Sequence, residues 1–143
     1  MNIAIVGATG NVGRKILEVL EKKELAIDNL YLLASSRSAG SKINFNGNEH
    51  EVIDLETFDF SKVKITFFAA GGKISENFAE IAAKHSLVID NSSFYRMDPD
   101  VPLIVPQVNS DHLNNIKKNI IANPNCSTAQ LVIALKPLHD LFK

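Results

Sequence analysis

The sequence predicts an α/β protein with a doubly wound, mainly parallel sheet and helices on both faces. Short, continuous apolar runs recur along the chain, as expected for strands that are buried on both sides. Amphipathic segments at helical spacing separate several of these runs. Polar or glycine-rich clusters follow the runs, and the carboxyl ends of parallel strands are where such sheets bind ligands. Strand and helix alternating in this way predict right-handed crossovers.

The first half of the chain begins with a strand at Ile3–Val6 and a helix from about Asn11. A second buried strand is expected at Leu30–Ala34. Residues 42–53 contain Asn46-Gly47 between two strand-like runs, which predicts a hairpin at the edge of the sheet. The apolar positions expected on one side of the first helix are Val12, Ile16, Val19 and Leu20.

Alternation continues in the second half. Strands are expected at 65–70, 87–89, 102–105 and 119–122, and helices at 75–85 and 110–116. The helix at 75–85 should turn Phe78, Ile81 and Ala82 inward, and Ser110 should cap the next one. The run Ala129–Leu135 predicts a buried helix.

Length and composition bound the function. The 143 residues suffice for one domain with a core, and a net charge of −1 gives no bias toward nucleic acid or membranes. A single cysteine cannot form an internal disulfide, which suits a reducing cytosol. We found neither a membrane-length apolar stretch nor a signal-peptide layout. We therefore expect a cytoplasmic protein with no nucleic-acid or membrane partner.

A glycine-rich loop joins the first strand to the first helix. It reads Gly7-Ala8-Thr9-Gly10-Asn11-Val12-Gly13, a G-x-x-G-x-x-G spacing that varies the usual G-x-G-x-x-G. Glycines here allow a tight turn, close approach to a pyrophosphate, and close helix–strand packing. The helix N-terminus adds donors and positive potential. The loop predicts a dinucleotide site of the Rossmann type.

The end of the second strand selects the dinucleotide. NAD sites place a carboxylate there, whereas NADP sites place arginine and hydroxyls around the 2′-phosphate. This strand runs into Ser36, Arg37 and Ser38 without a carboxylate. Arg37 offers a forked donor to a phosphate, so the sequence favours NADP(H) over NAD.

Cys126 lies between a Pro124-Asn125 turn and the predicted last helix. At a helix N-terminus, unpaired backbone N–H groups and the helix dipole favour a thiolate, which is a nucleophile when water can reach it. The alternative is a small buried apolar residue, the commoner role of a single cysteine. Arg96 also has two interpretations: it could bind a substrate anion or pair with Asp98 or Asp100, and spacing alone favours the ion pair.

Five segments together resemble aspartate-semialdehyde dehydrogenase. They are Gly7–Gly13, Ser36–Gly40, Asp90–Asp98, Val101–Asn109 and the run Asn123-Pro124-Asn125-Cys126-Ser127-Thr128. The resemblance is to the N-terminal portion of that enzyme and covers essentially the whole chain. N-acetyl-glutamyl-phosphate reductases are related, but their cysteine segment usually reads Gly-Cys-Tyr, so Asn-Cys-Ser-Thr favours the first family.

The resemblance implies a reversible, phosphate-dependent conversion of L-aspartate 4-semialdehyde and NADP to 4-aspartyl phosphate and NADPH. That step feeds lysine (through diaminopimelate), threonine and methionine synthesis. Cys126 would form an acyl-thioester, while Arg96 and Asn125 would contact phosphate or the acyl phosphate. The residues implied for the cofactor are Gly7, Thr9, Gly10, Asn11, Val12, Gly13, Ser36, Arg37, Ser38, Gly71 and Gly72.

The resemblance also implies what this chain does not carry. Residues 1–125 would form the NADP-binding domain, and 126–143 the nucleophile helix leading into a catalytic and dimerisation domain. That second domain would supply the general-base histidine, and the full enzyme would be a homodimer or homotetramer. The four histidines present match neither that base nor metal-ligand spacing, so no metal is expected. This fragment should bind cofactor, lack turnover, and expose apolar surface that promotes association.

Two other interpretations remain open at this stage. A natural short protein could bind NADP(H) without catalysis, as a sensor or interaction module. A decayed remnant would bind nothing well, but intact motifs at the strand ends argue against it.

Overall fold

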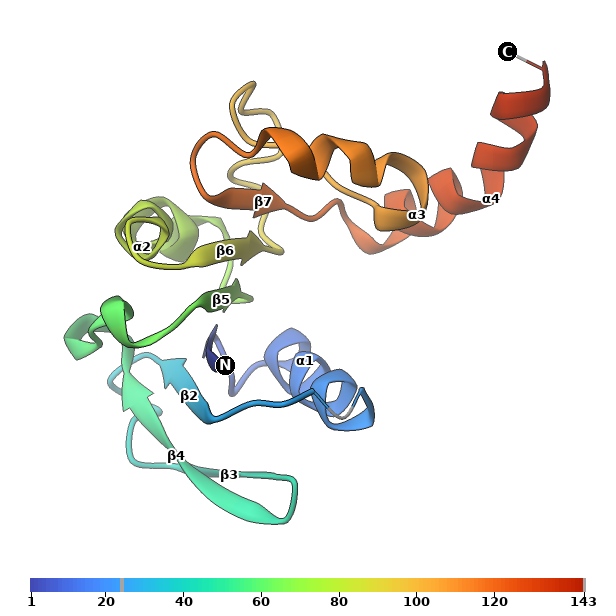
Figure 1. Ribbon diagram of the computed structural model, residues 1–143. Coiled ribbons are helices and arrows are strands. Elements are labelled where there is room, and N and C mark those ends of the chain that lie inside the picture. Colours follow the sequence, from blue (N-terminus) through green and yellow to red (C-terminus); the bar gives the residue numbers. More distant parts are fainter. Residues whose placement is uncertain (24, 143) are drawn as a thin grey trace.

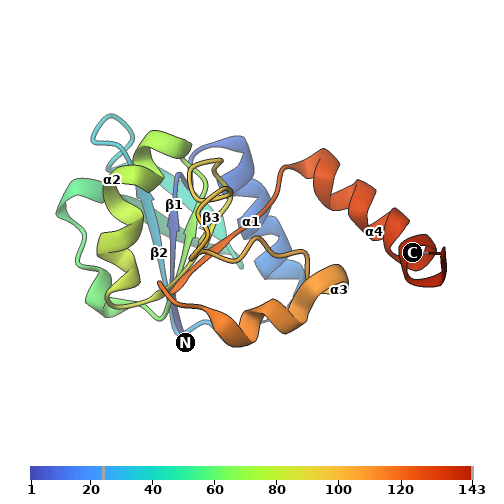
Figure 2. The same ribbon diagram turned by 90° about the horizontal axis from the view of Figure 1, so that it is seen from above.

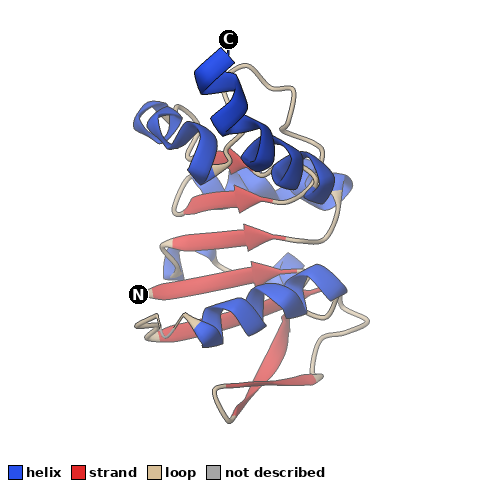
Figure 3. Cartoon of the chain, turned by 90° about the vertical axis from the view of Figure 1, so that its right-hand side faces the viewer, coloured by secondary structure: helices blue, strands red, loops and turns tan. Residues whose placement is uncertain are grey.

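The structure, a computed structural model, describes residues 1–23 and 25–142. Seven strands form one sheet in the order β3-β4-β2-β1-β5-β6-β7 (Figure 1). Their bounds are β1 Asn2–Val6, β2 Asn29–Ala34, β3 Lys42–Phe45, β4 Asn48–Asp54, β5 Ile65–Phe68, β6 Leu87–Asp90 and β7 Ile120–Ala122. All neighbouring strands run parallel except β3 and β4, which confirms the predicted sheet (Figure 3).

The helices are α1 Asn11–Lys22, α2 Gly72–Ala83, α3 Pro106–Asn109 and α4 Cys126–Phe142. Three short 3₁₀ helices lie at Leu55–Thr57, Phe60–Lys62 and Ser110–Asn115. The last of these replaces the predicted α-helix at 110–116, and its N-cap is Asn109 without a side-chain bond, so the expected Ser110 cap is wrong. The strand expected at 102–105 is reduced to a single bridge between Leu103 and Ala122.

The hairpin forms as predicted, but its place in the sheet differs. Asn46 and Gly47 both have positive φ (49° and 75°), the turn geometry that matches the strand twist. Only β3 lies at the edge, because β4 pairs in parallel with β2, Leu32 opposite Val52. The hairpin therefore contributes a full strand to the parallel sheet, and the carboxyl end of β4 joins the others.

The two long internal helices cover opposite faces of the sheet (Figure 2). Leu17 and Leu20 of α1 pack with Ile3, Ile5 and Leu32. Residues of α2 pack on the other face; the core there includes Ala79, Ala82, Phe68, Val88 and Ile120. The doubly wound arrangement is thus confirmed.

Three helical side chains lie differently from the sequence expectation. Val12 and Val19 of α1 are 51% and 46% exposed, and Leu17 is buried in their place. Ile81 of α2 is also exposed, whereas Ala82 is buried and Phe78 half-buried as expected. The spacing of apolar residues predicts each helix correctly but not which side of the helix faces the sheet. Each of these helices carries apolar residues on more than one side.

The last helix is not buried. None of the described residues of α4 is buried, so the expected burial of Ala129–Leu135 is wrong. α4 contacts α3 and projects away from the sheet (Figure 1). Within the described part of the chain, no helix has the length and apolarity needed to cross a membrane.

Candidate active site

The glycine loop has the geometry of a phosphate cradle. Gly7 has φ +84°, and a Cβ there would lie 2.8 Å from the Ala69 carbonyl group. A Cβ on Gly13 would overlap the Gly7 carbonyl oxygen, so α1 can approach the loop only with glycine at this position. Gly10 is exposed at the N-cap of α1, where its missing side chain leaves the approach open. These glycines fit a pyrophosphate at the helix N-terminus.

A cavity of about 330 Å³ opens beside this loop, within the range of small-molecule sites. Four strand ends and one helix surround it. The lining residues are Val6, Gly7, Thr9, Gly10, Ala34, Ser35, Asp54, Leu55, Glu56, Ala69, Ala70, Ile74 and Phe78. Of the predicted cofactor residues, Gly7, Thr9 and Gly10 line the cavity. Asn11 and Val12 lie beside it on the exposed first turn of α1.

Several lining residues were missed by sequence reasoning. Asp54, Leu55 and Glu56 follow β4, which the hairpin signal assigned to an edge excursion. Had β4 been placed beside β2, its carboxyl end would have pointed to this site. The Asp54 carboxylate accepts a bond from Glu56 N at 3.1 Å and caps the first 3₁₀ helix. The structure thus brings two carboxylates to the cavity that the sequence-based argument for NADP did not include.

The predicted 2′-phosphate residues lie on the loop after β2. Ser35 lines the cavity, and Ser36, Arg37 and Ser38 continue from it along the turn that ends at Gly40. Ser38 N donates to the Ser35 carbonyl at 2.8 Å, which fixes the turn. Arg37 is exposed, beyond the cavity lining. Arg37 is thus a solvent-exposed residue two positions after Ser35, which lines the cavity.

Gly71 and Gly72 begin α2. Gly71 is its N-cap with φ +88°, a conformation that favours glycine, and Gly72 is the first helical residue. Ala69 and Ala70, immediately before them, line the cavity instead. The two glycines therefore turn the chain between β5 and α2 at the rim of the site.

Cys126 is the first residue of α4 and is exposed, so the alternative of a buried apolar cysteine is wrong. Asn125 caps the helix: its Oδ1 accepts from Thr128 N at 2.8 Å and from Ser127 Oγ at 3.0 Å. These bonds leave the Asn125 amide Nδ2 available to a ligand. The thiol thus stands at a capped helix N-terminus, as the sequence predicted.

Arg96 does not form the predicted ion pair. Its Nε donates to the Asn123 carbonyl at 3.0 Å, and one terminal nitrogen donates to the Asn91 carbonyl at 3.0 Å. The acidic neighbours have other partners: Lys118 binds Asp98 and Lys117 binds Asp100. The side-chain bond from Lys118 also lowers the pKa of Asp98.

The guanidinium of Arg96 is half-buried and tied to the segment that leads to Cys126. Within the described residues, no carboxylate lies at ion-pair distance from it. A positive charge held without an internal counterion, on a segment bonded to Asn123 three residues before Cys126, is suited to binding an anion.

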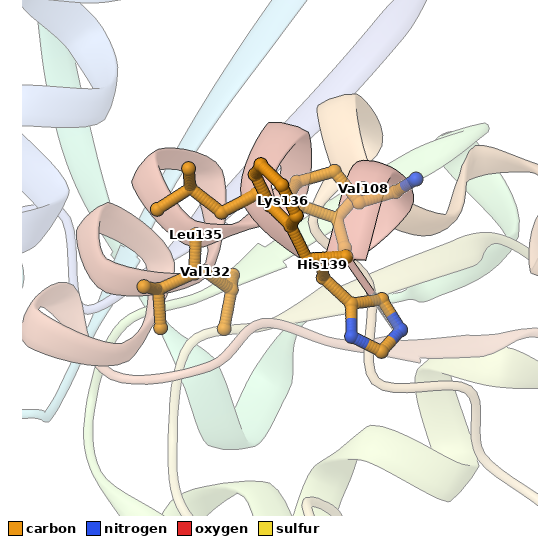
Figure 4. Close-up of a pocket in the computed structure, with 7 residues that line it drawn as sticks. Val108, Val132, Leu135, Lys136 and His139 are labelled. Atoms are coloured by element: carbon orange, nitrogen blue, oxygen red, sulfur yellow. The ribbon is translucent and has the colours of Figure 1, made fainter.

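A larger hollow lies elsewhere, between α3 and α4 (Figure 4). It has a volume of about 610 Å³, and its apolar lining includes Val108, Val132 and Leu135, with Lys136 and His139 among the side chains. It is open because α4 stands away from the sheet, and it contains neither the thiol nor the glycine loop. Cys126 is also absent from the lining of the cavity beside the glycine loop, so the described residues do not bring the thiol and the loop into one pocket.

Fold and glycine loop together define a dinucleotide-binding domain, and the chain also carries an exposed cysteine at the start of α4. Residues 2–116 match the family described as semialdehyde dehydrogenase, NAD binding domain. The chain belongs to this family.

Relatives and solved structures agree. Aspartate-semialdehyde dehydrogenase of Shewanella sp. (strain DB6705) is 49% identical over 143 residues. The alignment covers 99% of this chain but 42% of that protein. Aspartate semialdehyde dehydrogenase II from Vibrio cholerae, in a complex with ASA, superposes with a TM-score of 0.94 and 51% identity, covering 97% of this chain and 46% of that one.

The Candida albicans enzyme, solved with NADP, has a TM-score of 0.80 and 28% identity, covering 99% of this chain and 48% of that one. The chain thus spans less than half the length of the relatives it matches.

Proposed function

We propose that this chain is the cofactor-binding and nucleophile-bearing portion of an NADP-dependent, phosphorylating aspartate-semialdehyde dehydrogenase. The observation that carries the proposal is the exposed Cys126 thiol at the capped start of α4, next to a segment bound by Arg96. Membership of the semialdehyde dehydrogenase family, and relatives of that name, support the substrate class. Residues 1–125 would be the cofactor domain, and 126–143 the start of the catalytic part.

The proposed reaction proceeds on Cys126. The thiolate adds to the aldehyde carbon and forms a thiohemiacetal. The nicotinamide, when bound, supplies the acceptor for the hydride that leaves this carbon. Loss of the hydride, together with transfer of the hydroxyl proton to a general base, produces a thioester, which keeps the acyl group activated. Phosphate oxygen then attacks the acyl carbon, the C–S bond breaks, and the thiolate returns.

Arg96 and Asn125 are the proposed anion ligands. Arg96 offers charge-assisted donors to phosphate or acyl phosphate, and Asn125 offers its free amide. Formation of the thioester creates no negative charge for Arg96 to stabilise. The main contribution of Arg96 is therefore to hold the attacking phosphate near the acyl carbon. The general base would come from the second domain that the resemblance implies.

For the cofactor, the glycine loop would hold the pyrophosphate. Arg37, Ser36 and Ser38 would hold a 2′-phosphate at the mouth of the cavity. The Candida albicans relative was solved with NADP, which supports this choice. Asp54 and Glu56 argue against NADP, because carboxylates close to the adenosine end of the cofactor would repel a 2′-phosphate.

A binding measurement tests cofactor choice. Arg37→Ala should weaken NADPH binding by about tenfold or more, because it removes a forked donor to phosphate. NADH binding should change by less than about twofold, since NADH has no 2′-phosphate. Cofactor fluorescence titration measures both. A matched control is Lys42→Ala, which removes an exposed cation from β3 that already pairs with Glu49. Equal losses for NADPH and NADH would contradict the assignment.

The catalytic proposal needs a protein with both domains. Residues 1–143 should be joined to the remaining part of the Shewanella relative, which is 49% identical to this chain over the shared portion. The chimera should show phosphate-dependent semialdehyde oxidation, and Cys126→Ser should reduce it by at least about a thousandfold. The 143-residue chain alone should bind NADPH without measurable turnover.

A chimera that folds and binds NADPH but in which Cys126→Ser remains fully active would overturn the cysteine mechanism. The main alternative is a non-catalytic NADP(H)-binding module, for which cofactor binding would persist but the chimera would be inactive. A relative of N-acetyl-γ-glutamyl-phosphate reductase would instead accept the longer acylated semialdehyde.

A further inference from the structure

A side-chain bridge connects the ends of two neighbouring strands beside the proposed active site. Asn123 follows β7, and its Nδ2 donates to Oδ1 of Asn91, which follows β6, at 2.7 Å. Asn91 is fixed from a third strand as well, because its backbone N donates to the Phe68 carbonyl at 3.0 Å. Both asparagines are half-buried. No step of the proposed mechanism uses either of them.

The same two residues hold Arg96. Its Nε binds the carbonyl of Asn123, and a terminal nitrogen binds the carbonyl of Asn91. The guanidinium is therefore oriented by the two strand ends that the bridge connects. The N–H donors of a guanidinium have a fixed planar geometry. If the ends of β6 and β7 moved apart, the carbonyls of Asn91 and Asn123 could therefore no longer both accept hydrogen bonds from Arg96.

A buried carboxyl group holds the loop between β6 and Arg96 in place. Asp90, the last residue of β6, is fully buried. Its Oδ1 accepts from Ser75 Oγ of α2 at 2.8 Å and from Ser92 N at 3.0 Å, and its Oδ2 accepts from Ser92 Oγ at 2.7 Å. Ser92 Oγ in turn accepts from Phe94 N at 3.1 Å. The loop from β6 to Arg96 is thus fixed by satisfied buried bonds.

The segment from Asn123 to Cys126 has little conformational freedom. Asn123 N donates to the Asp90 carbonyl at 2.8 Å. Pro124 is buried and has a fixed φ, and Asn125 is held as the cap of α4. The backbone is therefore held as far as Asn125, one residue before the thiol.

We propose that Asn91 and Asn123 are positioning residues whose bridge sets the Arg96 guanidinium against the Cys126 thiol, so that a bound anion and the acyl group share one site. The inference rests on the proposed function, because it takes Arg96 as the anion ligand and Cys126 as the nucleophile. It assigns a role to residues that touch neither substrate nor cofactor.

Alkylation of Cys126, the single cysteine, tests this in the chain as it exists. Iodoacetate carries a negative charge and iodoacetamide carries none. The rate with iodoacetate divided by the rate with iodoacetamide therefore measures the positive potential at the thiol, and this quotient is the ratio used below. The ratio also cancels changes in the reactivity of the thiol itself. With the Arg96 guanidinium set against the thiol as proposed, the ratio should be roughly three- to tenfold above that of free cysteine. Arg96→Ala should return the ratio to the free-cysteine value.

Asn91→Ala and Asn123→Ala should each lower the ratio by about threefold although Arg96 is still present. When combined with Arg96→Ala they should have no further effect, because the bridge acts through Arg96. A matched control is Asn29→Ala, which removes a similar asparagine pair at the other end of the sheet, where Asn29 Nδ2 donates to Asn2 Oδ1 at 3.0 Å. This control should leave the ratio unchanged.

The outcomes separate the two proposals. A wild-type ratio equal to that of free cysteine, unaffected by Arg96→Ala, would contradict the proposed anion role of Arg96 itself. A high ratio that depends on Arg96 but not on Asn91 or Asn123 would overturn the positioning inference alone. A purely structural role would lower the free energy of unfolding of the asparagine variants, measured in urea, and leave their ratio unchanged.

Discussion

At the residue scale, the glycine loop depends on contacts that a single methyl group would break. The three glycines have different surroundings although the sequence spaces them evenly. A Cβ at Gly13 would overlap the Gly7 carbonyl oxygen and lie 2.8 Å from Ala8 Cα, both backbone atoms. A Cβ at Gly10 would meet nothing closer than the Gly7 oxygen at 3.4 Å, and Gly10 has negative φ.

Gly13→Ala should therefore destabilise the fold by about 3 kcal/mol or more, because α1 must move off the loop. Gly10→Ala should cost less than about 1 kcal/mol, the usual difference between glycine and alanine at an N-cap. Urea unfolding of the two variants measures both values. Similar destabilisation of the two would show that α1 does not pack on the loop as described.

The buried side chain of Tyr95 makes the free energy of unfolding depend on pH. Burial, together with the nearby charges of Glu80 and Asp90, raises the pKa of Tyr95 from 10.0 to about 12. The folded state thus keeps the phenol protonated, while the unfolded chain ionises it near pH 10. The resulting stabilisation is present below pH 10 and is lost as the pH rises from 10 to 12.

Titration of the phenolate absorbance in a Tyr31→Phe background, where Tyr95 is the remaining tyrosine, should give a midpoint near 12. In Tyr95→Phe, the fall in unfolding free energy between pH 10 and 12 should be smaller than in the parent. Ionisation of the folded protein near pH 10 would contradict the burial of this side chain.

At the element scale, the helix that begins at Cys126 packs little against the rest of the chain. α4 has 17 residues and none of those described is buried, whereas α2 buries Ser75, Ala79, Ala82 and Ala83. Pro137 inside α4 removes one backbone donor and clashes with the preceding turn. Helices of this length are marginal in water without tertiary packing.

Backbone amides of α4 should therefore exchange with solvent at least about a hundredfold faster than those of α2. Hydrogen exchange followed by NMR or mass spectrometry measures this directly. Binding of the remaining domain in the chimera should slow exchange in α4 and leave α2 unchanged. Protection of α4 in the isolated chain equal to that of α2 would contradict its exposed position.

The elements also show what sequence could and could not predict. Apart from the strand at 102–105 and the helix at 110–116, the strands and helices of the alternation are predicted correctly, because apolar runs and glycine loops are local signals. The position of β4 was not, because an Asn-Gly turn specifies which strands form a hairpin but not which one joins the sheet. Asp54 and Leu55 were missed for that reason. For Arg96, spacing alone favoured an ion pair with Asp98 or Asp100, because the separation of Asn91 and Asn123 along the chain conceals that both carbonyls accept from its guanidinium.

At the scale of the whole molecule, the sheet is covered unevenly. In a parallel ladder, paired residues point to the same face, so Ile65, Phe67, Leu87 and Ile89 share one face. It is the face on which α1 packs, because Ile3 and Ile5 pair with Ile65 and Phe67. Over β5 and β6 these four side chains remain half-buried, while Phe68 and Val88 on the α2 side are fully buried.

The uncovered area continues onto α1. Val12, Ile16 and Val19 line an apolar hollow together with Phe67. Strands of a doubly wound sheet normally bury both faces. An apolar surface of this kind favours association.

The isolated chain should therefore self-associate as its concentration rises, with Val12 and Val19 in the contact. Changing both to lysine should weaken association by roughly tenfold or more, because it removes apolar contact and places charges in the interface. Sedimentation velocity over a concentration series measures the effect. Met97→Lys is the control: Met97 is 92% exposed but lies in the loop after β6, away from this face. If Met97→Lys weakened association as much as the α1 variant, or if the chain stayed monomeric at all concentrations, the half-covered sheet face would not be the surface through which copies of the chain meet.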